Sequence, residues 1–170
     1  GFALSVDFPR AAHGFKGDDA TYYSLTYSLA RDLDFAFTRD DLVRVWDEFA
    51  TGPEGIFLKR GRRVTLRRDD AFPWVRIGKP YVVDRLFYGK SFIYPLVAAP
   101  FVRVFGTNGF LVLHALLLTA CFGAGVAWLR APGSSPPLAV AYAATFLGVS
   151  IVPVYLVWLT PELFNFSLVF

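Results

Sequence analysis

The chain has 170 residues, of which 55% are hydrophobic and 18% are charged, whereas an ordinary soluble domain carries about 25% charged residues. The charge is unevenly distributed: residues 1–104 hold 13 acidic and 16 basic side chains, and residues 105–170 hold only Arg130 and Glu162. This division predicts a polar segment joined to a membrane segment and excludes a disordered chain. The single cysteine excludes a disulfide-rich module, and the balanced charges, with a net charge of +3, exclude a nucleic-acid-binding domain.

Residues 2–6 resemble the tail of an earlier apolar helix, and the chain contains no Met. We therefore expect a piece of a longer protein. A helix is predicted over residues 17–32, with Asp18 as its N-cap and apolar side chains at helical spacing along one face. A second, shorter helix is predicted over residues 41–49.

Two basic stretches, residues 55–60 and 63–67, flank Gly61 and Arg62. This pattern predicts a β-hairpin whose turn contains that glycine. The arginines of the hairpin are interpreted as a solvated surface.

Two runs without charge follow, residues 110–129 and residues 138–159. Each has the roughly 20 residues that a helix needs to cross a bilayer, so both are predicted to be transmembrane helices. Residues 130–137 form a short connector rich in proline, glycine and serine. Residues 92–105 are too few to cross and are interrupted by two prolines and an arginine, so they are predicted to lie at the membrane interface.

The predicted fold class is therefore a mainly α, multi-span membrane protein. Its long polar loop region, residues 1–109, contains short helices and a small β-hairpin. A short connector between two spans returns the chain to the face from which it came. Residues 160–170 are therefore expected on the same face as the polar region, and residues 130–137 on the other.

Single polar residues within the apolar half need an interpretation. His114 lies inside the first predicted span, where a polar side chain is a candidate for function. A neutral histidine that bonds a neighbouring helix is the favoured interpretation, and Cys121 is interpreted as a small packing residue. His13 lies far from His114 in the chain, and the sequence has no glycine-rich phosphate loop, HExxH or CxxC motif.

Three acidic residues stand close to the predicted membrane segments. Asp18 and Asp19 are adjacent at a helix start, and Glu162 directly follows the second span. A carboxylate in such a place can act as a general base toward a hydroxyl or amine, or can hold a metal ion. It can also simply cap a helix, and the spacing alone leaves these alternatives open.

Four short stretches carry a family resemblance: Gly17-Asp-Asp-x-x-Tyr22, Gly78-Lys-Pro80, Tyr94-Pro95…Ala99-Pro100…Phe105-Gly106 and Thr160-Pro-Glu162. They resemble bacterial GT-C-fold glycosyltransferases, multi-span enzymes similar to protein O-mannosyltransferases and lipid A aminoarabinose transferases. The resemblance covers the part of such an enzyme from the first extracytoplasmic loop through the third span. The chain departs from the family in having Asp-Asp where Asp-Glu is commoner, and in its basic hairpin, which leaves the acceptor open.

The resemblance implies transfer of a sugar from a polyprenyl-phosphate donor to an acceptor at the outer face of a bacterial inner membrane. It implies that Asp18 is the catalytic base, that Asp19 supports it, and that Glu162 is the second acid. The residues expected to bind the donor, with its phosphate on the three cations, are Lys79, Arg85, Lys90 and Tyr22. The alternative for these cations is contact with anionic lipid head groups.

The expected partners are the lipid-phosphate donor and membrane lipids, with no nucleic acid. The sequence leaves the cofactor unknown, and a divalent metal is left open. A function from another class is a non-catalytic membrane protein, such as a transporter subunit or an assembly factor, whose polar segment binds a partner. Charges buried within the spans would favour a transporter. Both predicted spans have none, whereas acids stand at the span ends, which favours the enzyme.

Overall fold

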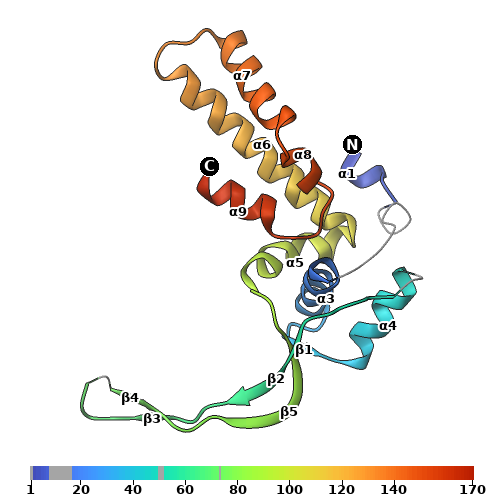
Figure 1. Cartoon of the computed structure of the whole chain (residues 1–170), viewed down its shortest axis with the longest axis vertical. Helices are drawn as coiled ribbons and strands as arrows, with labels where there is room; N and C mark the ends of the chain where they lie inside the picture. The colour runs from blue at the N-terminus through green and yellow to red at the C-terminus, as the bar shows by residue number, and fades with distance from the viewer. Residues whose placement is uncertain (1, 8–16, 50–51, 73) are drawn as a thin grey trace.

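A computed structural model of the chain describes residues 2–7, 17–49, 52–72 and 74–170. The helices are α1 (Phe2–Ser5), α3 (Asp18–Arg31), α4 (Arg39–Glu48), α5 (Ile93–Phe105), α6 (Asn108–Arg130), α7 (Pro136–Val149), α8 (Val152–Tyr155) and α9 (Glu162–Val169). The strands are β1 (Ala36–Phe37), β2 (Leu58–Arg63), β3 (Leu66–Arg68), β4 (Val75–Ile77) and β5 (Tyr81–Tyr88). The long apolar helices occupy one end of the molecule and the strands the other, with α3 and α5 between them (Figure 1).

Helix α3 is the buried centre of the polar half, although it is rich in hydroxyl side chains. Ser24 and Thr26 donate hydrogen bonds to the carbonyls of Ala20 and Tyr22, one turn earlier in the helix, at 2.8 and 2.6 Å. These bonds satisfy hydroxyl groups that would otherwise be costly to bury. Helix α3 can therefore pack against α5 without losing hydrogen bonds.

The predicted N-cap of this helix is wrong. Asp18 is the first helical residue, Gly17 is the N-cap, and no side chain caps the helix. Gly17 has a φ of 61°, a conformation that glycine adopts without strain. Its N–H donates to the Glu54 carbonyl at 2.7 Å, and the Thr21 hydroxyl accepts a bond from the Phe57 N–H at 3.0 Å. The loop before β2 thus closes over the helix start and leaves the Asp18 carboxylate uncommitted to capping.

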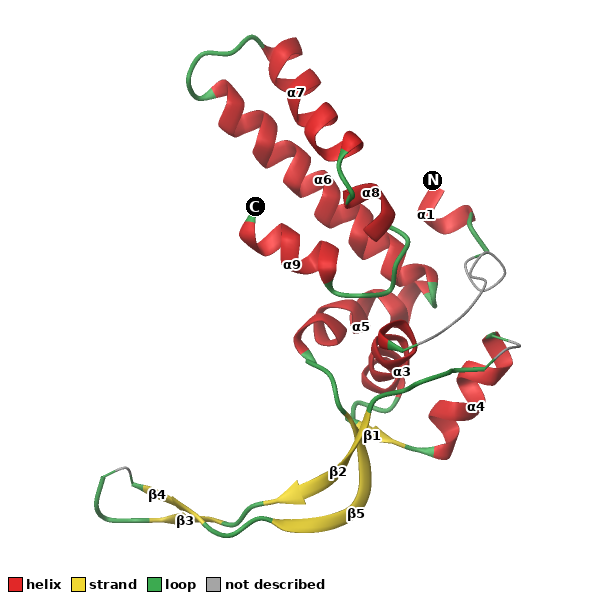
Figure 2. Cartoon of the chain, in the orientation of Figure 1, coloured by secondary structure: helices red, strands yellow, loops and turns green. Residues whose placement is uncertain are grey.

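The predicted hairpin turn at residues 61–62 is also wrong. Strand β2 continues through Gly61 and pairs antiparallel with β5, while β3 pairs with β4, so the chain reverses only between β3 and β4. A Cβ atom at Gly61 would lie 2.5 Å from a ring carbon of Phe87. The glycine is therefore explained by a close approach across the ladder and not by a turn. The result is a long β-ribbon that extends away from the helices (Figure 2).

Among the described residues, α6 is the one helix long and apolar enough to cross a membrane, judged by length and composition. The uninterrupted helix predicted over residues 138–159 is wrong, because α7 ends at Val149. The ring of Pro153 is incompatible with a helical turn that includes the Val149 carbonyl, four residues earlier. At 1.5 Å per residue the 14 residues of α7 extend about 21 Å. Whether α7 and α8 together cross a bilayer stays a prediction.

The predicted interfacial segment forms the helix α5, which has Pro100 in its interior and ends at Phe105, with Gly106 as its C-cap. Helix α5 packs between α3 and α6 and so joins the polar half to the apolar half. The contact with α6 is close, because a side chain at Gly109 would collide with the Phe101 carbonyl group. The membrane-interface location of α5 remains a prediction.

Candidate active site

Two helix starts from opposite ends of the chain meet beside α5. Helix α3 begins with Asp18 and Asp19, and α9 begins with Glu162. Tyr94 of α5 connects them: its ring lies 5.9 Å from the ring of Tyr22 on α3 and 5.8 Å from the ring of Phe164 on α9, measured between centroids. The charges of Glu162 and Asp18 both act on the Asp19 carboxyl, so the three acids singled out in the sequence lie within electrostatic range of one another.

Asp19 is the most perturbed of these acids. Its Oδ1 atom is buried and has no hydrogen-bond partner among the described residues. Burial, followed by the nearby charges of Glu162 and Asp18, raises the pKa of Asp19 from 3.8 to about 6. A carboxylate whose pKa lies near neutral pH is well suited to proton transfer and is typical of functional sites.

Asp18 faces solvent and forms an ion pair. Its Oδ1 lies 2.7 Å from Nζ of Lys90, and the Asp18 side chain is 49% exposed. The Lys90 ammonium also lies 4.5 Å from the centroid of the Phe57 ring, an additional cation–π contact. Lys90 is thus held beside Asp18 by one carboxylate and one aromatic ring.

Tyr22 lies in the same electrostatic environment. Burial raises the pKa of its hydroxyl, the positive charge of Lys90 lowers it, and the charges of Asp18 and Glu162 raise it further. The net effect is a raised pKa, so Tyr22 is a neutral hydrogen-bonding group at physiological pH. The predicted substrate residues Tyr22 and Lys90 therefore lie with the acids.

The other two predicted phosphate ligands do not lie there. Lys79 is exposed between β4 and β5, and Arg85 is exposed on β5. Arg85 lines a separate hollow of about 540 Å³ that also contains Asp34 and Arg60. At about 3.3 Å per residue, the extended strand puts Lys79 tens of ångströms along the chain from Lys90. The predicted grouping of three cations around one phosphate is therefore not observed, and Lys90 alone accompanies the acids.

His114 reinforces the site from the apolar side. Its Nδ1 lies 3.0 Å from the Leu156 carbonyl, and its Nε2 lies 2.8 Å from the Tyr94 hydroxyl. Because a carbonyl only accepts, Nδ1 carries the proton and Tyr94 donates to Nε2. The prediction that His114 bonds a neighbouring helix is confirmed. Cys121 is buried, as a packing residue would be, and His13 lies outside the described residues.

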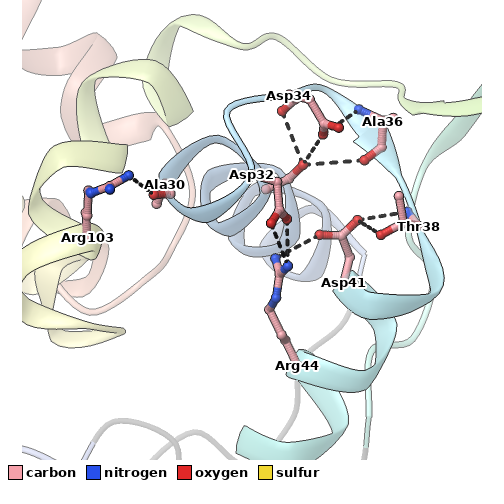
Figure 3. A network of polar contacts seen from close by, with 9 residues as sticks. Ala30, Asp32, Asp34, Ala36, Thr38, Asp41, Arg44 and Arg103 are labelled. Carbon is pink, nitrogen blue, oxygen red and sulfur yellow. Dashed lines mark hydrogen bonds and ion pairs between the residues drawn. The ribbon is translucent and has the colours of Figure 1, made fainter.

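A second polar network fastens the far end of α3 and has a structural role (Figure 3). The buried Asp41 accepts bonds from the N–H and hydroxyl of Thr38, a capping box at the start of α4. Arg44 reaches both Asp41, at 3.2 Å, and Asp32, at 2.6 Å. Burial raises the pKa of Asp41 despite these bonds and the positive charge of Arg44. Sequence reasoning missed this network, although Thr and Asp three residues apart at a helix start are a recognisable signal.

Comparisons with known proteins add no relative: no protein-family model, curated protein sequence or solved structure matches the chain. Within the described residues, no group of three or more histidine, cysteine or acidic side chains could hold a metal ion.

Proposed function

We propose that the chain forms part of a membrane glycosyltransferase that moves a sugar from a polyprenyl-phosphate donor to an extracytoplasmic acceptor at a bacterial inner membrane. The observation that carries this proposal is the meeting of Asp18, Asp19 and Glu162 beside Lys90 and Tyr22. Distant parts of the chain contribute to a cluster with an unpartnered buried carboxylate oxygen and a raised pKa. Such a cluster has little value for stability, which supports a chemical role.

In the proposed reaction, an acceptor hydroxyl or amine attacks the anomeric carbon of the donor sugar. The new bond forms as the bond between that carbon and the phosphate oxygen breaks. The phosphate leaves as a stable anion, so no general acid is needed. A carboxylate removes the acceptor proton, and general-base assistance of this kind is worth about 10²–10⁴-fold in rate.

The contacts support different roles for the two adjacent aspartates. Asp18 is the more accessible and is proposed as the base, because a base must reach the acceptor. A donor phosphate that binds Lys90 competes with Asp18 for the ammonium and frees the carboxylate to take a proton. The negative charges of Asp19 and Glu162 near Asp18 favour transfer of the acceptor proton to the Asp18 carboxylate.

The test is sugar transfer by the full-length protein in membranes, normalised to folded protein. Asp18→Asn keeps the size and polarity of the side chain but cannot accept a proton, so turnover should fall about 10²–10⁴-fold. Asp40→Asn, an exposed change on α4, is the matched control. Loss of turnover in Asp19→Asn but not in Asp18→Asn would transfer the role of base to Asp19. Full activity in both variants would refute the proposed mechanism and favour a non-catalytic membrane protein.

A further inference from the structure

The β-ribbon is strongly basic. Residues 58–79 hold two acidic side chains and eight basic ones: Lys59, Arg60, Arg62, Arg63, Arg67, Arg68, Arg76 and Lys79. One acid, Asp69, forms an ion pair with Arg76. Every residue of β3 and β4 is exposed. An isolated two-stranded ribbon is only marginally stable in water, so we expect this exposed, basic ribbon to be stabilised by a binding partner.

The outer part of the ribbon is amphipathic. Directly opposed residues of an antiparallel pair lie on the same face, and successive residues alternate between faces. The opposed pair Leu66 and Ile77 therefore shares one face with Val75 and with Arg68, which lies opposite Val75. The opposed pair Arg67 and Arg76 occupies the other face. Arg76 is already paired with Asp69, but the ribbon as a whole keeps an excess of six basic over acidic side chains, which an anionic surface would complement.

The tip of the ribbon presents two large aromatic side chains. Phe72 is 80% exposed and Trp74 is 62% exposed, and their rings pack edge to face with centroids 5.0 Å apart. Trp74 has a φ of 58°, a conformation that bulky residues rarely adopt. Its backbone is held there by bonds to Ala71 and Asp69 at 2.7 and 2.9 Å. Exposed aromatic rings next to arginines are typical of proteins that contact the interfacial region of a membrane.

We propose that the ribbon docks on an anionic phospholipid surface, with Phe72, Trp74 and the apolar face of β3 and β4 entering the interface and the arginines contacting the head groups. A lipid surface supplies negative charge and an apolar layer together. An acidic polymer in water would neutralise the arginines but would leave Leu66, Ile77 and the aromatic tip exposed. The proposal requires the membrane placement of α6 from the proposed function and is independent of the transfer reaction.

The test uses the full chain in lipid nanodiscs of phosphatidylcholine, with or without phosphatidylglycerol. Cys121→Ala removes the native thiol, and a single cysteine then carries an environment-sensitive fluorophore at Phe72→Cys, at Val43→Cys on α4, or at Leu116→Cys on α6. We expect the label at residue 72 to be quenched by nitroxide lipids in discs that contain phosphatidylglycerol. The label at residue 116 should be quenched in both kinds of disc, and the label at residue 43 in neither.

The arginines provide the second variant. Each basic residue near an anionic surface is worth about a fivefold change in binding, so replacing Arg67, Arg68 and Arg76 by Gln should lower the inserted population about a hundredfold. Replacing Arg31 and Arg39, exposed residues of α3 and the start of α4, is the matched control. Quenching at residue 116 but not at residue 72 would overturn the docking proposal alone. Absence of quenching at residue 116 would overturn the membrane placement as well. If a soluble acidic polysaccharide, and not anionic lipid, changes the emission of the fluorophore at residue 72, the ribbon binds an acidic polymer instead.

Discussion

Lys90 offers the sharpest test of the donor site, because the structure separates its role in binding from its role in stability. The Asp18–Lys90 pair is partly exposed, with 49% and 26% of the two side chains accessible. Exposed ion pairs contribute about 0.2–1 kcal/mol and exposed cation–π contacts about 0.5–1 kcal/mol, so Lys90→Gln should lower the free energy of unfolding by no more than about 2 kcal/mol. A charge-assisted contact with a phosphate is worth about 1.5–3 kcal/mol, which corresponds to a loss of donor affinity of about 10–150-fold.

The assay is the rate of sugar transfer as a function of donor concentration, with thermal unfolding measured on the same preparations. The half-saturating donor concentration should rise in Lys90→Gln while the midpoint of unfolding falls only modestly. Lys79→Gln is the informative comparison, since Lys79 lies on the exposed ribbon and should leave donor affinity within about twofold. Unchanged donor saturation in Lys90→Gln would refute the phosphate role, and equal effects of the two variants would refute the geometric distinction between them.

Three further predictions follow from single contacts. Burial raises the pKa of Asp19 to about 6, so the protonated side chain favours folding at low pH, and this contribution to stability declines as pH rises from about 4 through about 6. Asp19→Asn should remove this pH dependence. After allowing for partial exposure, it should stabilise the protein at pH 7 by about 1–2 kcal/mol, measured by denaturation at a series of pH values. Tyr94→Phe should cost about 1–3 kcal/mol in thermal unfolding, because it leaves Nε2 of His114 buried without its donor, whereas the exposed Tyr142→Phe should have no effect. Gly109→Ala should destabilise by about 1–3 kcal/mol or more through a collision with the Phe101 carbonyl, while Gly123→Ala, with open space around it, should be neutral or stabilising in the same assay.

Acidic residues at the helix starts and apolar side chains at helical spacing predicted the helices of the polar half, because both signals are local. The sequence pattern predicted the turn of the β-hairpin wrongly, because a glycine between basic β-forming residues is as compatible with a close cross-strand contact as with a turn. Gly61 belongs to the first case, since Phe87 of β5 lies over it. That distinction depends on a strand more than 20 residues away, which local pattern does not specify.

The candidate site was partly accessible from the sequence. Motif spacing identified Asp18, Asp19 and Glu162, and the structure brings them together. Charge alone could not predict that Lys90 lies with the acids and Lys79 does not. Strand β5 separates the two lysines, and it places Lys79 on the ribbon, away from the helices. Tyr94 was seen only as part of a motif, and its contact with His114 depends on the packing of α5 against α6.

The prediction of one uninterrupted helix over residues 138–159 was wrong, and the way in which the chain departs from it affects the candidate site. In an uninterrupted helix over residues 138–159, the Leu156 carbonyl would accept the backbone N–H of residue 160. Instead it faces His114 at 3.0 Å, and His114 in turn accepts the bond from Tyr94, whose ring contacts both α3 and α9. The Leu156 carbonyl is free to orient His114 because α8 ends at Tyr155. The break after Val149 and this early helix end together lead the chain to α9, whose first residue is Glu162. Pro153 accounts for the first of these two interruptions, and both fall next to the candidate site, which is where local sequence patterns are expected to fail.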